Sequence, residues 1–152
     1  MKIKASWGTP MKLKSNLKEN RIYWADTDKI PGKPGCYFFY NQHGNNIRIM
    51  YIGKAQNLKK RVEQQFLRNV PLMVGMSNFL KGSKMLMFCE MEGKADKRLD
   101  ILESQLIKAA TLEGHVLLNI KGTKKIIKHV IEFTKTNRSS NQVFKKYMNV
   151  LS

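Results

Sequence analysis

The apolar residues of the chain follow two different periods, and the first of them indicates paired strands. Residues 36–40 (CYFFY) and 47–52 (IRIMYI) are dense in aromatic and β-branched side chains, which is typical of β-strands. The polar segment between them contains Gly44, and glycine adopts the positive φ angle of a tight turn without steric penalty. These residues predict an antiparallel hairpin whose second strand ends at Gly53.

Beyond the hairpin the period changes to that of a helix. Leu58, Val62 and Phe66 recur every four residues and form one apolar face. Asn57 stands directly before them, where it can cap the helix that they predict. A second, shorter helix is expected within 71–82, because a proline opens this segment and a glycine closes it.

The elements that follow complete a small domain. Residues 84–91 (KMLMFCEM) predict a third strand. Residues 97–112 predict the most regular helix of the chain, with Asp96 as its cap and a stripe of leucines along one face. Residues 115–120 (HVLLNI) predict a short buried strand or turn. We therefore expect an α/β (α+β) fold in which a small three-stranded antiparallel sheet is flanked by helices.

The amino-acid composition predicts the kind of partner that the protein binds. The 152 residues include 28 Lys and Arg against 11 Asp and Glu, which gives a formal net charge of +17. Such an excess repels itself unless the protein binds a polyanion, so nucleic acid is the expected partner and an anionic membrane surface is the alternative.

Other features of the composition concern location. No apolar run approaches the roughly twenty residues that a membrane-spanning helix needs. The N-terminus has cations but lacks the apolar core of a secretory signal. Cys36 and Cys89 each lie in an apolar, strand-like run and are expected to be buried, reduced thiols. Together these features predict a cytoplasmic protein that does not insert into membranes.

The positive charge continues into both ends of the chain. We expect a basic N-terminal extension (1–32), a domain over 33–121 and a basic C-terminal extension (122–152). The extensions either clamp phosphates or form loosely ordered, solubilising arms. The helical spacing of apolar residues in 144–151 predicts a closing segment that packs on the domain or on a second copy, so a homodimer is left open.

Glu103 is an anomaly within the long helix, because it lies on or beside the apolar stripe between Leu99 and Leu106. No residue three or four positions away is cationic, so a local ion pair cannot compensate its charge. Burial of a carboxylate is costly unless something pairs with it. Two partners fit the pattern: a Lys or Arg from elsewhere in the chain, or a metal ion.

The order of these features resembles a known family. GCY at 35–37 followed by YIG at 51–53 is similar to the paired tyrosine motif of the GIY-YIG nucleases. YIGKAQNLKKRV at 51–62 resembles the version found in the N-terminal nuclease domain of UvrC-type repair proteins. The resemblance continues through LESQLIK at 102–108, where the family has its metal-binding glutamate, and covers roughly residues 33–121.

This resemblance implies a divalent-metal-dependent DNA endonuclease. Tyr37 and Tyr51 would be its two active-site tyrosines, and Arg61 its catalytic arginine. Glu103 would bind Mg²⁺, or Mn²⁺ in its place. The further residues are Asn119, which matches a late asparagine of the family, the accessory cation Lys54, and the cations expected on DNA, namely Lys54, Lys59, Lys60 and Arg68. The alternative is a non-catalytic basic nucleic-acid-binding protein on the same scaffold.

These residue types suit phosphodiester hydrolysis. Because Mg²⁺ keeps most of its waters, one glutamate is a sufficient protein ligand, and the planar fork of Arg61 matches phosphate oxygens. Nearby cations are expected to hold the pKa of an active-site tyrosine below its usual value of about 10, so that it can accept a proton from water. Either Tyr37 or Tyr51 could do so. We favour Tyr51, which stands beside Lys54 and precedes the helix of Arg61.

Overall fold

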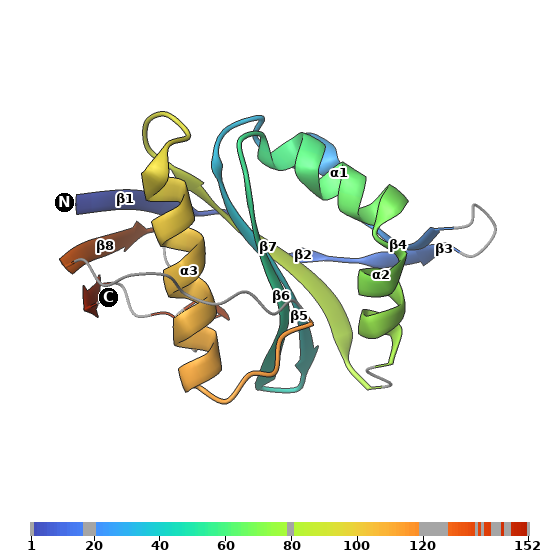
Figure 1. The fold of residues 1–152 in the computed structure, drawn as a ribbon. Coiled ribbons are helices and arrows are strands. Elements are labelled where there is room, and N and C mark those ends of the chain that lie inside the picture. The colour runs from blue at the N-terminus through green and yellow to red at the C-terminus, as the bar shows by residue number, and fades with distance from the viewer. Residues whose placement is uncertain are drawn as a thin grey trace.

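The computed structural model shows a twisted sheet with helices packed against both of its faces (Figure 1). The predicted α/β (α+β) class is therefore confirmed. The structure describes residues 2–16, 21–78, 81–118, 128–135, 137, 139–140, 144 and 147–151.

Three antiparallel strands form the centre of the sheet. β5 (Gly35–His43) and β6 (Asn46–Ala55) make the predicted hairpin, and Gly44 in its turn has a φ angle of +60°. β7 (Ser83–Met91) pairs with the other side of β5, so the order β6-β5-β7 is the three-stranded unit expected from the sequence. β6 differs from the prediction in one respect, because it continues through Gly53 to its end at Ala55.

Residues 2–16 form strands, most of them in the same sheet, which overturns the alternative of a loosely ordered arm for these residues. In β1 (Lys2–Trp7), Ile3, Ala5 and Trp7 alternate with polar residues and are only 1%, 2% and 2% exposed. This period of two is that of a strand with one buried face, and β1 pairs antiparallel with β7. The other strands of this segment are β2 (Met11–Lys12), which pairs with β7, and the separate hairpin of β3 (Lys14–Asn16) and β4 (Arg21–Trp24).

The C-terminal residues extend the sheet beyond β1. β8 (Lys128–Thr134) runs parallel to β1, and β9 (Tyr147–Leu151) runs antiparallel to β8. Within the described residues the sheet thus has seven strands, where the sequence predicted three. The helical spacing expected over 144–151 is wrong for residues 147–151, because pairing with β8 satisfies their backbone groups in an extended conformation.

Three α-helices have both ends within the described part of the chain, and each begins after a side chain that accepts a backbone N–H. α1 (Leu58–Arg68) is capped by Asn57 and α3 (Lys97–Leu112) by Asp96, as predicted. α2 (Val70–Ser77) is capped by Asn69, and the short 3₁₀ helix η2 (Thr27–Lys29) precedes β5. Of these described helices, none has the length and apolar character required to cross a membrane.

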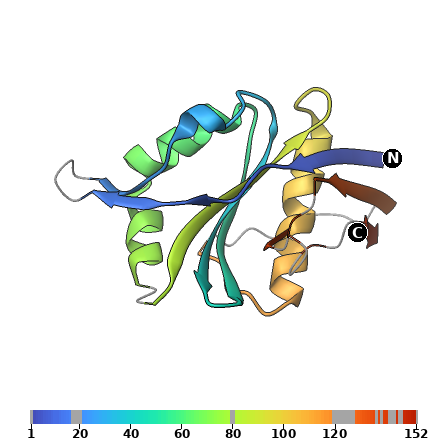
Figure 2. The ribbon, with the colours of Figure 1, turned by 180° about the vertical axis from the view of Figure 1, so that it is seen from behind.

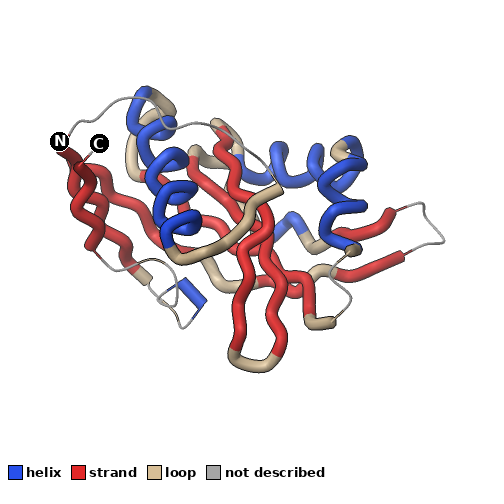
Figure 3. Tube along the Cα trace, turned by 60° about the horizontal axis from the view of Figure 1, so that its bottom comes forward, coloured by secondary structure: helices blue, strands red, loops and turns tan. Residues whose placement is uncertain are grey.

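The helices divide the core into two clusters on either side of β5. Cys36, Phe38 and Tyr40 contribute to the cluster under α3, whereas Tyr37 and Phe39 contribute to the cluster under α1 and α2. Figure 2 shows α3 apart from α1 and α2 in the view from behind, and Figure 3 shows the strands running between the two groups of helices. This alternation follows from the period of two in a strand.

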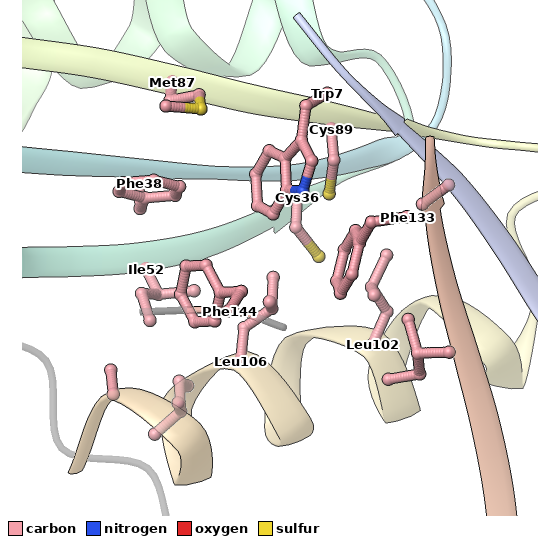
Figure 4. Packing of buried hydrophobic residues seen from close by; sticks show 14 of the residues in the cluster. Trp7, Cys36, Phe38, Ile52, Met87, Cys89, Leu102, Leu106, Phe133 and Phe144 are labelled. Carbon is pink, nitrogen blue, oxygen red and sulfur yellow. The ribbon is translucent and has the colours of Figure 1, made fainter. Parts of the chain in front are cut away.

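The cluster under α3 joins the two ends of the chain to the domain. The ring of Trp7 stacks on Phe133 at 4.9 Å and on Phe144 at 5.7 Å between centroids (Figure 4). Phe144 is 1% exposed, so the closing segment packs on the domain at this residue. Cys36 and Cys89 face each other across β5 and β7 in the same cluster, and both are free thiols without exposed surface, as predicted.

Residues 115–118 differ from the prediction of a buried strand or turn. Val116 and Leu118 are 78% and 45% exposed, and the segment lies outside the strands of the described chain. It is held against β6 by two hydrogen bonds. The Ile49 N–H donates to Nδ1 of His115 at 2.9 Å, and the Leu118 N–H donates to the carbonyl oxygen of Met50 at 2.7 Å. One side-chain and one backbone hydrogen bond to an edge strand, together with the partly buried Leu117, therefore position this segment.

Replacing Trp7 with alanine should lower the free energy of unfolding by about 3–5 kcal/mol, the usual loss for a buried tryptophan. Urea unfolding followed by circular dichroism would measure it. Lys4→Ala, on the exposed face of the same strand, is the control and should stay within about 0.5 kcal/mol of the natural protein. Equal losses for the two variants would contradict a β1 strand with one buried face.

His115 should make stability depend on pH. Burial lowers the pKa of His115, and the nearby Arg48 charge adds to this effect. The folded protein therefore favours the neutral ring, whose contribution is complete above the unfolded pKa of about 6.5 and is lost as the pH falls below it. His115→Asn keeps an acceptor for Ile49 without titrating. Chemical unfolding between neutral and mildly acidic pH should show the natural protein losing more stability than this variant. If the free energy of unfolding of both proteins falls equally with pH, His115 is not the source of the pH dependence.

Candidate active site

The register of the hairpin brings the two predicted tyrosines together. Tyr37 on β5 lies opposite Gly53 on β6, and Tyr51 lies two residues earlier on β6. Both rings contact the cluster under α1 and α2. Their centroids are 6.2 Å apart and their planes are inclined by 28°. The phenols are thus neighbours on one face of the sheet.

Two motif glycines are explained by close approaches. A Cβ atom on Gly53 would lie 2.5 Å from both Cζ and the hydroxyl oxygen of Tyr37, so the ring of Tyr37 can cross β6 only over a glycine. A Cβ atom on Gly35 would collide with the carbonyl oxygen of Cys89 on β7. Space therefore accounts for the glycines of the GCY and YIG segments.

Helix α1 presents Arg61 to the tyrosines. Leu58 and Val62 have no exposed surface and seat the helix on the sheet, whereas Lys60 and Arg61 lie on its exposed side. The Arg61 guanidinium lies near the Tyr37 hydroxyl, where its charge acts to lower the pKa of that phenol. The structure thus places Tyr37, Tyr51 and Arg61, the residues that the family resemblance implies, near one another.

Gln65 belongs to the same group, although the sequence analysis did not identify it. It lies one turn beyond Arg61 and is 4% exposed. Its Nε2 donates to the hydroxyl oxygen of Tyr37 at 2.5 Å and to that of Tyr51 at 3.3 Å. The signal in the sequence is an amide among the apolar residues of the helix, because a buried polar group needs hydrogen-bond partners.

The environment of Tyr37 raises its pKa, which corrects the expectation that nearby cations lower it. Burial is the largest cause, because Tyr37 is 1% exposed and the charged form loses its solvation. The hydrogen bond from Gln65 and the nearby Arg61 act in the opposite direction but do not overcome burial. Tyr37 is therefore a neutral phenol at neutral pH.

A second group of predicted residues lies toward α3. Glu103 is 6% exposed on this helix. Lys54 on β6 donates a hydrogen bond to Asp100, one turn before Glu103. This bond raises the pKa of Lys54, and the charge of Glu103 raises it further. A distant lysine, one of the two partners that the sequence allowed for Glu103, thus contributes to its electrostatic environment.

A cleft of about 670 Å³ is lined by Arg61 from the first group and by Lys54 and Asp100 from the second, whereas neither tyrosine lines it. Arg61 and Lys60 line it from α1, Lys54 lines it from β6, and Asp96 and Asp100 line it from the start of α3. Glu103 is not among the lining residues; it lies one turn further along α3 than Asp100. The cleft therefore has a cationic wall on α1 and an acidic wall on α3.

The residues beside this cleft fit a magnesium site by their chemistry. Mg²⁺ takes oxygen ligands and is commonly held by one or two carboxylates together with waters and phosphate oxygens. Glu103 and Asp100 supply two carboxylates on successive turns of α3. In the described part of the chain no three His, Cys, Asp or Glu residues gather as a complete ligand set. Ligands from water and substrate would therefore have to complete the coordination.

The other predicted residues are placed differently. Lys59 does not line the cleft, since its Nζ pairs with Asp28 of η2 at 3.1 Å. Arg68 is exposed in the last turn of α1. Asn119 lies outside the described residues. Lys54 and Lys60 are thus the two predicted DNA-binding cations that the structure places in the cleft.

The helix-flanked sheet, the tyrosine pair and the glutamate on α3 define a GIY-YIG domain. A family model described as a UvrC-like GIY-YIG domain matches residues 33–111, slightly more than half of the chain. The chain therefore belongs to the UvrC-like GIY-YIG family. The N-terminal strands β1 to β4 and the C-terminal strands β8 and β9 lie outside this match.

Curated relatives agree with this family. The UvrABC system protein C of Mycoplasma mycoides is 35% identical over 92 residues, which cover 60% of this chain and 15% of that protein. The protein of the same name from Mycoplasma capricolum is 34% identical over 104 residues, 68% of this chain and 16% of its own length. That of Neisseria meningitidis is 31% identical over 93 residues, 58% of this chain and 13% of the relative. The chain thus spans about one seventh of the length of these relatives, and no solved structure matches it.

Replacing Gly53 with alanine should destabilise the protein by about 1–3 kcal/mol, the range for inserting a methyl group into a packed site. The added Cβ atom would displace the ring of Tyr37. In a Tyr37→Ala background the same substitution should have little effect, because no ring remains to collide with it. Urea unfolding of the four proteins in this cycle measures the coupling. Equal effects in both backgrounds would show that Gly53 serves something other than the ring.

Proposed function

We propose that this chain is a divalent-metal-dependent DNA endonuclease that hydrolyses phosphodiester bonds. Membership of the UvrC-like GIY-YIG family supports a nuclease. The observation that carries the proposal is the convergence of two phenols and the Arg61 guanidinium beside a cleft whose opposite wall is α3.

The charge of the chain favours DNA as the substrate. A net charge of +17 suits a polyanion, and Lys60, Arg61 and Arg68 are all exposed along α1. These side chains can hold phosphates without reading the base sequence. Binding should accordingly weaken steeply with salt. The homodimer and the cytoplasmic location stay predictions from the sequence.

Arg61 would bind the phosphate that is attacked. Its planar fork can engage two phosphate oxygens and offset the negative charge that develops on them. Glu103, with Asp100 as the nearby second carboxylate, would hold the Mg²⁺ ion, for which Mn²⁺ could substitute. When bound, the ion supplies charge stabilisation to the departing 3′ oxygen.

The two tyrosines would take different parts. Tyr37 is buried and neutral, so it can orient a water molecule or a phosphate oxygen by hydrogen bonding but does not start as a phenolate. Tyr51 is partly exposed on the same face. We assign the acceptance of the water proton to the oxygen of Tyr51, which can reach solvent and substrate and which passes its own proton to a phosphate oxygen as it does so.

Plasmid nicking tests the proposal most directly. Glu103→Gln and Arg61→Ala should each lower the cleavage rate in Mg²⁺ about 100-fold or more, the usual loss for a residue that stabilises developing charge. DNA affinity should be largely retained by Glu103→Gln. Glu113→Gln, the same substitution at the C-cap of α3, is the matched control and should cleave at the natural rate. Chelation of divalent ions should stop cleavage, and added Mn²⁺ should restore it.

Two outcomes would overturn the proposal. Cleavage by Glu103→Gln at the natural rate would show that Glu103 does not bind the catalytic metal ion. Salt-sensitive DNA binding by the natural protein, without cleavage in Mg²⁺ or Mn²⁺, would favour the alternative of a non-catalytic nucleic-acid-binding protein.

A further inference from the structure

Asn69, which joins α1 to α2, is hydrogen bonded in a way that fixes the orientation of its own side chain. Its Oδ1 accepts from the backbone N–H of Leu72 at 3.1 Å, as the N-cap of α2. A backbone N–H can only donate, so the oxygen of the Asn69 amide must face Leu72. The amide nitrogen of Asn69 therefore points the other way, toward Gln65.

This orientation is passed to Gln65. The Nδ2 of Asn69 donates to Oε1 of Gln65 at 2.8 Å. Because the oxygen of Gln65 faces Asn69, its nitrogen faces the two tyrosines, with Nε2 at 2.5 Å from the Tyr37 hydroxyl and 3.3 Å from the Tyr51 hydroxyl. The capping bond of α2 thus decides which end of the Gln65 amide meets the phenols.

The consequence concerns the phenol protons. Both hydroxyl oxygens accept from Nε2 of Gln65. A phenol oxygen that accepts in this way keeps its own O–H to donate in another direction. If the Gln65 amide were reversed, its oxygen would face the phenols, and the O–H groups of both tyrosines would donate to it. Gln65 is 4% exposed, so bulk water could not easily compensate for a wrong orientation.

We infer that Asn69 and Gln65 are positioning residues that keep the Tyr37 and Tyr51 hydroxyls turned away from α1, with their protons available to the water and phosphate of the reaction. The role in the reaction rests on the proposed nuclease function. The direction of the hydrogen bonds does not, because it follows from the contacts of Leu72, Asn69 and Gln65 alone.

Asn69→Asp tests this arrangement without removing the cap. An aspartate accepts the Leu72 N–H as well as asparagine does, so stability should be retained. A carboxylate cannot donate to Oε1 of Gln65, and repulsion between the two oxygens should turn the Gln65 amide over. Both phenols would then donate to Gln65. Asn69→Ser is the uncharged comparison, since it also caps α2 but cannot reach Gln65 with a donor amide.

The direct measurement needs neither DNA nor metal. The intensity ratio of the tyrosine doublet in the Raman spectrum distinguishes a phenol that accepts a hydrogen bond from one that donates it. The difference spectrum between each protein and its Tyr37→Phe counterpart isolates Tyr37. In Asn69→Asp the intensity ratio of Tyr37 should change from that of a phenol that accepts a hydrogen bond to that of one that donates it. An unchanged ratio in a folded Asn69→Asp protein would overturn the inference.

Cleavage kinetics test the role in the reaction. Asn69→Asp should lower kcat about tenfold or more with little change in KM, because acid–base positioning acts in the transition state. In a Gln65→Leu background, Asn69→Asp should have no further effect on kcat, since the amide that relays orientation is absent. A persisting loss in that background would assign the effect to the added charge and overturn the positioning role.

The two proposals can fail separately. A doublet that reverses as expected in a protein that never cleaves DNA would overturn the nuclease function and support the hydrogen-bond direction. A doublet that reverses while kcat is unchanged would overturn the positioning role and leave the nuclease function standing.

Discussion

The packing of the Tyr37 ring across Gly53 is the contact on which the rest of the site depends. It requires glycine opposite Tyr37 on β6, because a side chain at position 53 would push the ring away. It also holds the Tyr37 hydroxyl where Gln65 and Arg61 of α1 can reach it. The position of the Tyr37 phenol is therefore set by one steric constraint within a hairpin. A rigid site follows, since sheet pairing and ring packing leave the phenols little freedom.

Burial keeps the Tyr37 phenol of this site neutral. The phenol of Tyr37 is taken out of water, and its pKa rises although Gln65 donates to it and Arg61 lies near it. The donor therefore serves to orient a neutral hydroxyl rather than to ionise it. A capping residue of α2 helps to set that orientation through Gln65. The junction between α1 and α2 is in this way connected to the chemistry of the site, although Asn69 touches neither tyrosine in the hydrogen bonds described.

The sheet brings together residues that are distant in sequence and that lie on its two opposite faces. Tyr37 and Arg61 lie on the α1 side of β5, whereas Lys54 turns toward α3, Asp100 and Glu103. Arg61 and Lys54 nevertheless line the same cleft, although they come from opposite sides of the edge strand β6. The terminal strands complete the fold from outside the family match. β1 and β8 pair in parallel and place Trp7 on Phe133 beneath α3.

Local sequence signals determined much of the centre of this protein. The hairpin, α1, α3 and their caps follow from the hydrophobic period and from Asn57 and Asp96, and the motif spacing identified the tyrosine pair with Arg61. Only the tertiary structure decided what depends on distant partners. It placed β1 against β7 and β8, it assigned Lys54 to Asp100 and Glu103, and it showed that burial outweighs nearby cations at Tyr37. The physical reason is that period and capping act over a few residues, whereas strand pairing, desolvation and charge depend on which segments the fold brings into contact.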